Sequence, residues 1–85
     1  MAYTVIIKPA AEKELKRLGR EVQVRVRPFI KALAKDPRPP GCKKLVGFDD
    51  LYRIRVGNYR VVYQIRDEVL LVLVVRVAHR SKVYD

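Results

Sequence analysis

The segment spanning residues 51–66 constrains the fold of this chain more than any other. Two stretches of alternating polar and apolar residues, 51–56 and 59–66, flank the dipeptide Gly57-Asn58. This arrangement predicts an antiparallel hairpin with a two-residue turn. In that register Val56 pairs with Tyr59, and Arg55 faces Arg60.

The predicted register sorts the hairpin side chains onto two faces. The face expected to pack against helices carries Tyr52, Ile54, Val56, Tyr59, Val61, Tyr63 and Ile65. The opposite face carries Arg53, Arg55, Arg60, Gln64 and Arg66. Like charges directly opposite each other destabilise a sheet by up to about 1 kcal/mol. Keeping two arginines there favours a phosphate between them, because guanidinium groups grip phosphate oxygens bidentately. A solvated cationic face that resists aggregation is the alternative.

The rest of the chain predicts two helices and two further strands. Residues 3–8 are rich in β-branched side chains and predict a strand. Pro9 suits the start of a helix ending near residue 18, and residues 20–35 predict a second helix that Pro28 kinks or splits. Asp67-Glu68 is expected to turn the chain into residues 69–77, an apolar strand buried on both faces. In this register Arg76 is an edge or structural residue, and the arginine-bearing face gains Leu71, Leu73, Val75, Val77 and His79.

The period changes to two from Lys43 onward, which allows three or four strands after the helices. The resulting order, β-α-α-β-β-β-β, predicts an α+β fold. Two N-terminal helices pack on one face of a mostly antiparallel sheet of four or five strands. A chain of 85 residues is expected to form a single domain, residues 1–85. The opening sequence lacks the apolar core of a signal peptide, and residues 69–77 are too few to span a bilayer. We therefore expect a cytoplasmic protein with no membrane contact.

The charge balance points to a polyanionic partner. Nineteen Lys and Arg residues against nine Asp and Glu give a net charge of +10. Such a field attracts nucleic acid first, an acidic protein second and an anionic membrane third. The sequence shows no metal-binding set, no Gly-rich phosphate loop and no cofactor motif, and its lone Cys42 excludes an internal disulfide.

Cleavage of RNA by its own 2′-OH fits this residue set. The substrate supplies the nucleophile, so the protein needs only to position it, neutralise charge and transfer protons. Arginines can neutralise the phosphate. A tyrosine whose phenol pKa is lowered by neighbouring arginines can accept the 2′-OH proton as a phenolate. His79 is either a proton-transfer group or an ordinary surface residue.

Three segments resemble one family. Residues 51–56 (LYRIRV), residues 58–63 (NYRVVY) and residues 77–84 (VAHRSKVY) are similar to RelE toxins of the RelE/ParE superfamily. The opening Met1-Ala2-Tyr3 and Lys44-Leu45 before Gly47 are also similar, so the resemblance covers essentially the whole chain.

The resemblance implies the toxin of a type II toxin–antitoxin system. RelE-like toxins enter the ribosomal A site and cleave mRNA by 2′-OH attack, leaving a 2′,3′-cyclic phosphate and stopping translation. Its implied partners are the 70S-type ribosome, mRNA and a cognate, acidic, RelB-like antitoxin in a hetero-oligomer. Neither a cofactor nor a metal is implied.

The resemblance also assigns roles by position. Arg53 and Arg55 match a basic pair, often lysines, that stabilises charge; arginine cannot shuttle protons as lysine does. Arg60 matches the phosphate-binding arginine, His79 or Arg80 the general acid, and Tyr84 the general base. Further contacts to the RNA backbone are expected from Lys43, Lys44, Arg66 and Lys82.

Two other functions remain open. ParE-type relatives share the scaffold yet inhibit DNA gyrase without nuclease activity. A plain RNA- or DNA-binding module is the third possibility, and it requires the arginines but not Tyr84.

Overall fold

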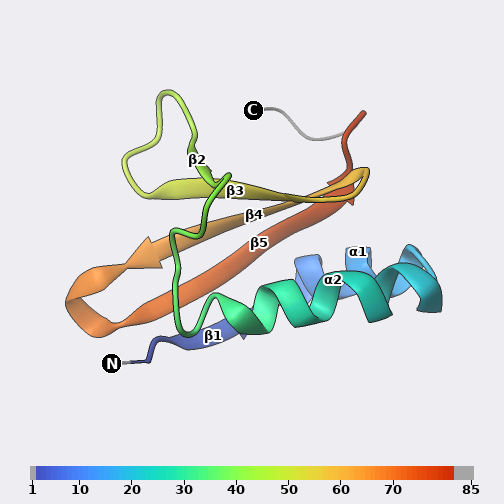
Figure 1. The fold of residues 1–85 in the computed structure, drawn as a ribbon, viewed down its shortest axis with the longest axis horizontal. Coiled ribbons are helices and arrows are strands. Elements are labelled where there is room, and N and C mark those ends of the chain that lie inside the picture. Colours follow the sequence, from blue (N-terminus) through green and yellow to red (C-terminus); the bar gives the residue numbers. More distant parts are fainter. Residues whose placement is uncertain (1, 82–85) are drawn as a thin grey trace.

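The computed structural model describes residues 2–81. Its elements follow the expected order, with helices and strands coloured along the chain in Figure 1. They are β1 (Thr4–Ile7), α1 (Pro9–Arg17), α2 (Arg20–Ala32), β2 (Lys43–Lys44), β3 (Leu51–Val56), β4 (Tyr59–Arg66), the 3-10 turn η1 (Asp67–Val69) and β5 (Leu71–His79). The predicted α+β class is confirmed.

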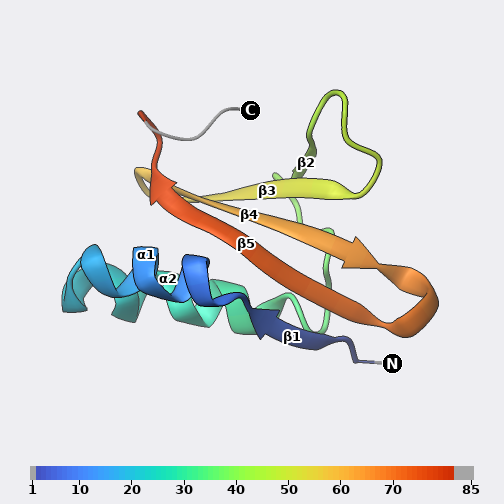
Figure 2. The ribbon, with the colours of Figure 1, turned by 180° about the vertical axis from the view of Figure 1, so that it is seen from behind.

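The five strands form one mixed sheet in the order β1-β5-β4-β3-β2. Every neighbouring pair is antiparallel except β1 and β5, which run parallel from Thr4 opposite Leu71 to Ile7 opposite Val74. Figure 2 shows the two strands side by side. The first strand of the chain therefore needs the last one as its partner.

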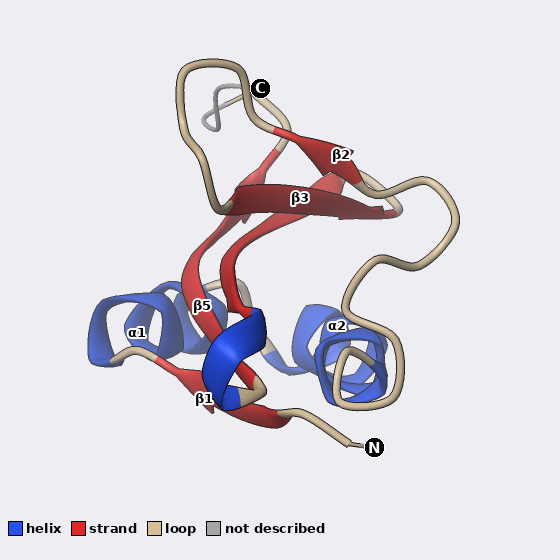
Figure 3. Cartoon of the chain, turned by 90° about the vertical axis from the view of Figure 1, so that its left-hand side faces the viewer, coloured by secondary structure: helices blue, strands red, loops and turns tan. Residues whose placement is uncertain are grey.

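Both helices cover the same face of the sheet (Figure 3). Helix α1 has Pro at its first position, where the missing N–H costs little, and it buries Ala11 and Leu15. Helix α2 buries Val26 and Ile30 and runs through Pro28 without a break, so the predicted helix is confirmed and Pro28 does not split it. These side chains share one core with the sheet residues Ile54, Val56, Val61, Tyr63, Ile65, Val72, Val74 and Val77. Neither helix in residues 2–81 is long and apolar enough to cross a bilayer.

The predicted β3–β4 hairpin is confirmed residue by residue. Val56 is the Cα partner of Tyr59, and Arg55 that of Arg60. Gly57 has a φ of +60°, as the first central position of a type II′ turn requires. The apolar face of the hairpin packs under the helices as expected.

A β-bulge corrects the register predicted for β5. Leu71 and Leu73 pair with Arg66 and Gln64, on the arginine-bearing face as expected, but the register shifts between Val62 and Tyr63. An extra residue in β5 exchanges the two faces beyond it. Val77 therefore enters the helix-side core, and His79 packs against Tyr59, contrary to the prediction.

The burial of β5 also differs from the expectation. Its residues alternate between buried and half-buried as far as Val75, so one face is only partly covered. Beyond the bulge, Ala78 joins a second, small apolar cluster with Leu45 and Val62. Arg76, predicted to be an edge or structural residue, lies on an inner strand, and its guanidinium is 3.1 Å from the carboxylate of Glu14 in α1.

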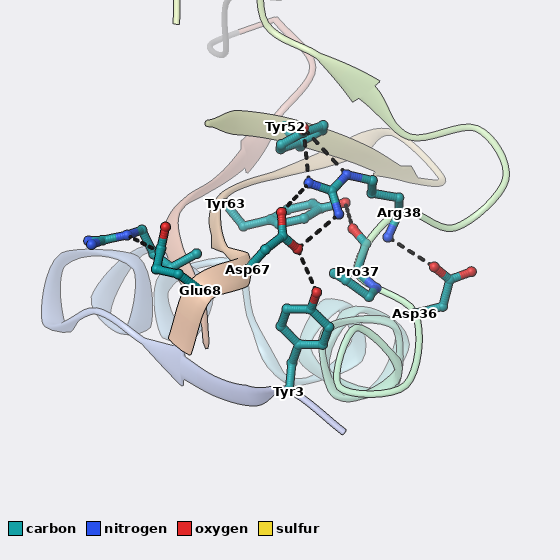
Figure 4. A network of polar contacts seen from close by, with 9 residues as sticks. Tyr3, Asp36, Pro37, Arg38, Tyr52, Tyr63, Asp67 and Glu68 are labelled. Carbon is teal, nitrogen blue, oxygen red and sulfur yellow. Dashed lines mark hydrogen bonds and ion pairs between the residues drawn. The ribbon is translucent and has the colours of Figure 1, made fainter. Parts of the chain in front are cut away.

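A polar clamp anchors the connector that follows α2 (Figure 4). Arg38 binds Asp67 with both terminal nitrogens, at 2.9 and 3.2 Å, and its guanidinium lies 5.0 Å from the ring centroid of Tyr52. The hydroxyl of Tyr3 also donates to Asp67. Hydrogen bonds, from Arg38 first and Tyr3 second, lower the pKa of Asp67 to about 2. The clamp thus joins Tyr3, just before β1, to the connector, β3 and the turn before β5.

Tyr63 fixes the same connector from inside. Its ring is fully buried, and its hydroxyl donates to the carbonyl oxygen of Pro37 at 2.7 Å. Burial raises the pKa of this phenol, so the hydroxyl keeps its proton and remains a donor.

Candidate functional site

A small pocket at the tip of the β3–β4 hairpin gathers three arginines. Its volume is about 110 Å³, and its lining is formed by Arg55, Gly57, Tyr59, Arg60 and Arg80. The cross-strand pairing brings Arg55 and Arg60 together. Arg80 follows β5, and its backbone N–H donates to the carbonyl of Asn58 at 2.8 Å, which holds it against the turn. Three different segments thus converge on one pocket.

The chemistry of this arginine pocket is that of an anion site. None of the described residues that line it is acidic. Like charges so close together repel, and an anion between them removes the repulsion. Guanidinium groups offer a planar fork of donors that matches phosphate oxygens. A phosphodiester therefore suits this pocket better than a cation or an apolar ligand.

The structure distinguishes the two candidates for the general acid, His79 and Arg80. Arg80 lines the arginine pocket, whereas His79 is not among its lining residues. The imidazole of His79 meets the ring of Tyr59 edge-on, with centroids 5.5 Å apart. Its Nδ1 accepts a hydrogen bond from the backbone N–H of Ser81 at 3.3 Å. These contacts place His79 beside the pocket, with its orientation set by its neighbours.

Arg53 occupies a different environment from the one its face suggested. Only 2% of its surface is exposed, although it lies on the outward side of β3, opposite the face that packs under the helices. It lines a larger groove of about 540 Å³, which Arg55 also borders. The groove lies between α2, the connector and β3, and most of its other lining residues are apolar, including Phe29, Leu33, Pro39, Pro40 and Ile54.

The remaining predicted RNA contacts are spread out. Lys43 lines the larger groove beside Arg53, and Lys44 is exposed on β2. Arg66 lies at the opposite end of β4 from the arginine pocket and pairs with Glu68 at 2.9 Å. Tyr84 and Lys82 fall outside the described residues. Among residues 2–81, no three His, Cys, Asp or Glu side chains lie together as a metal site.

Helix α2 adds a cation that the sequence did not point to. A Cβ atom on Gly57 would lie 3.0 Å from Nη2 of Arg25 and 3.8 Å from its Cζ. The guanidinium of Arg25 therefore rests against the hairpin turn that borders the arginine pocket. Only the packing angle between α2 and the sheet brings them together, and local sequence carries no signal for it.

Comparison with known proteins identifies the family. The model of a family described as "ParE toxin of type II toxin-antitoxin system, parDE" matches residues 5–84. The "mRNA interferase toxin RelE" of Escherichia coli is 35% identical over 89 residues, spanning all of this chain and 93% of that protein. "Toxin RelG" of Mycobacterium tuberculosis is 31% identical over 85 residues, covering 99% of this chain and 98% of that protein.

Solved structures agree with the sequence matches. The archaeal RelE–RelB complex from Pyrococcus horikoshii contains a chain with a TM-score of 0.82 and 30% identity, matching 98% of this chain and all of that one. The intact RelBE toxin–antitoxin complex of Escherichia coli gives a TM-score of 0.78 and 34% identity over 92% of this chain and 96% of that one. On sequence and fold together, this chain belongs to the RelE/ParE superfamily of type II toxins as a RelE-type member.

Proposed function

We propose that this toxin is a ribosome-dependent mRNA endoribonuclease that cleaves codons in the ribosomal A site. The observation that carries the proposal is the convergence of Arg55, Arg60 and Arg80 on one small pocket at the hairpin tip. The relative in Escherichia coli that carries the name mRNA interferase supports the same reaction. A cytoplasmic location follows, because translating ribosomes and mRNA are found there.

The reaction needs no nucleophile from the protein. The 2′-OH of the RNA attacks the adjacent phosphorus, a bond forms between O2′ and P, and the bond from P to O5′ breaks. The products are a 2′,3′-cyclic phosphate and a 5′-OH end. Arg55 and Arg60 neutralise the charge that develops on the phosphorane, and donors already in place do so without reorganisation.

Proton transfers complete the reaction. Tyr84 is the proposed base that takes the proton of the 2′-OH, a role open to a phenol whose phenolate form is favoured by positive charge. Arg80 hydrogen-bonds the leaving O5′ and stabilises its charge, and O5′ takes up a proton from solvent water as its bond to phosphorus breaks, because the guanidinium keeps its own proton. We assign this role to Arg80 rather than His79 because Arg80 lines the arginine pocket. Arg53 adds positive electrostatic potential to the site from its buried position. The proposed reaction needs no metal ion.

An acidic, RelB-like antitoxin is the proposed partner that silences the toxin. The net charge of +10 favours a partner of opposite sign. The similar chains from Pyrococcus horikoshii and Escherichia coli were both solved as complexes with RelB. We expect a hetero-oligomer of toxin and antitoxin in which RNA is excluded from the arginine pocket.

Cleavage on the ribosome provides the test. The purified toxin is added to ribosomes programmed with a defined mRNA, and the new 5′ ends are mapped. Cuts confined to the A-site codon are expected, and a 2′-deoxy nucleotide at the cut position should abolish them because the nucleophile is missing. Cleavage of the deoxy substrate would refute 2′-OH attack.

Inhibition of DNA gyrase is the competing function. The name of the matching family model, which refers to ParE, is the observation that favours it. Intact mRNA together with gyrase trapped on DNA would establish this alternative. The arginine pocket argues for the nuclease, because inhibition by binding alone does not require three guanidinium groups around one anion.

A further inference from the structure

Arg25 is a cation with no role in the site so far described. It is exposed on α2, and within residues 2–81 it has neither an ion pair nor a side-chain hydrogen bond. Its neighbour Arg27 shows the contrast, since it binds Glu12 with both terminal nitrogens. Arg25 is therefore available to a ligand in a way that Arg27 is not.

The position of Arg25 is defined by the hairpin turn. Its Nη2 atom would be 3.0 Å from a Cβ on Gly57 and its Cζ 3.8 Å, so only glycine leaves room for this guanidinium without displacing it. Gly57 in turn borders the arginine pocket. The same turn thus borders the arginine pocket and contacts the guanidinium of Arg25.

Arg25 stands outside the pocket itself. The described lining of the pocket includes Arg55, Arg60 and Arg80 but not Arg25. A phosphate held in the pocket is therefore contacted by those three arginines, whereas Arg25 lies against the neighbouring turn, next to the pocket. An RNA strand carries one phosphate per nucleotide, so its next phosphate is the anion available there.

We propose that Arg25 binds the phosphate adjacent to the scissile one and so forms a second phosphate subsite on α2. The proposal rests on the nuclease function and extends it from one phosphate to two. A contact on each of two successive phosphates fixes the direction of the strand as well as its position. Phosphate contacts of this kind set register and orientation without reading the bases.

A coupling experiment on programmed ribosomes tests the subsite. Two mRNAs are made, each with one uncharged methylphosphonate, placed at the phosphate on either the 5′ or the 3′ side of the scissile one. Wild type and Arg25→Ala are compared on both and on unmodified mRNA, with kcat/KM of cleavage as the readout. Arg20→Ala, which removes another exposed arginine of α2, is the matched control.

The expected result is non-additivity at one of the two positions. On unmodified mRNA, Arg25→Ala should lower kcat/KM about tenfold, as expected for one charge-assisted hydrogen bond. On one of the methylphosphonate mRNAs this loss should vanish, because the charge that Arg25 binds is already gone. Arg20→Ala should lose the same small factor on all three mRNAs.

Two failures are distinguishable. If wild type cleaves but the effects of Arg25→Ala and of both methylphosphonates simply multiply, the subsite is refuted while the nuclease stands. If wild type cleaves no mRNA on ribosomes, the proposed function itself fails and the subsite fails with it.

Discussion

Arg55 and Arg60 face each other as Cα partners across the β3–β4 hairpin, one position from its turn. Because their Cα atoms are directly opposite each other, the two side chains start from the same position along the strands. The backbone N–H of Arg80 donates to the turn, which holds Arg80 nearby. The convergence of these three guanidinium groups on one pocket is the reason to expect the activity changes below.

Arg60→Ala is expected to lower kcat for mRNA cleavage on ribosomes roughly 10²- to 10³-fold, the cost of removing one positioned donor to developing charge. The substitution should leave the fold intact, because the side chain that it shortens is half-exposed and does not belong to the hydrophobic core. Circular dichroism checks the fold. Lys13→Ala removes an equal charge from the exposed surface of α1 and should keep nearly full activity. Equal losses in both variants would mean that only the overall charge matters.

Arg80 and His79 are separable by substitution. Arg80→Ala should lower kcat at least tenfold more than His79→Asn, because only Arg80 lines the arginine pocket. Single-turnover cleavage measured from pH 5.5 to 8 gives the comparison. A larger effect of His79→Asn than of Arg80→Ala would transfer the role to the histidine.

Tyr84→Phe removes the proposed general base and nothing else from the ring. General bases contribute roughly 10²- to 10⁴-fold, so cleavage and growth arrest should both be lost. Binding to ribosomes should remain, as a co-sedimentation assay can show. A fully toxic Tyr84→Phe variant would remove Tyr84 from the mechanism.

The clamp between Arg38 and Asp67 makes stability depend on acid pH. The pKa of Asp67 falls from 3.8 to about 2 in the folded protein, so its contribution is present above about pH 4 and disappears as the pH falls through 2. Asp67→Asn should therefore be less stable than wild type at pH 7, with the difference shrinking from pH 4 to pH 2. Urea unfolding across this range measures it. A difference that stays constant would show that the carboxylate charge is irrelevant.

Tyr63→Phe tests how the connector is fixed. The substitution leaves the buried carbonyl of Pro37 without its donor at 2.7 Å, which should lower the free energy of unfolding by about 1–3 kcal/mol. Denaturant titration at neutral pH provides the measurement. Tyr52→Phe is the comparison, since its half-exposed hydroxyl is contacted only weakly by Arg38 at 3.3 and 3.4 Å and should cost less. Equal losses would argue against a special role for the buried bond.

The hairpin was predictable because its information is local. Gly57-Asn58 sets the turn, and the alternating residues on either side leave only one register that buries the apolar face. The pairing of Arg55 with Arg60, and hence most of the candidate site, follows from that register. The parallel pairing of β1 with β5 was not predictable in this way, because its partners are more than sixty residues apart.

The prediction for β5 was wrong where the sequence does not alternate between polar and apolar residues. The run from Leu71 to Val75 is apolar throughout, so nothing in it marks the bulge that turns Val77 inward and carries His79 with it. Arg53 follows the alternation correctly, yet only 2% of its surface is exposed in the folded protein, which the alternation alone does not predict. Arg25 reaches the site only through the packing of α2, which no local pattern encodes.

The parallel contact between β1 and β5 also sets the order in which the molecule becomes active. Strand β5 lies between β1 and β4, and it leads directly into Arg80. During synthesis, the sheet cannot close and the third guanidinium cannot take its place until the chain has emerged as far as that residue. A nascent copy therefore lacks the complete pocket while most of its length is being made.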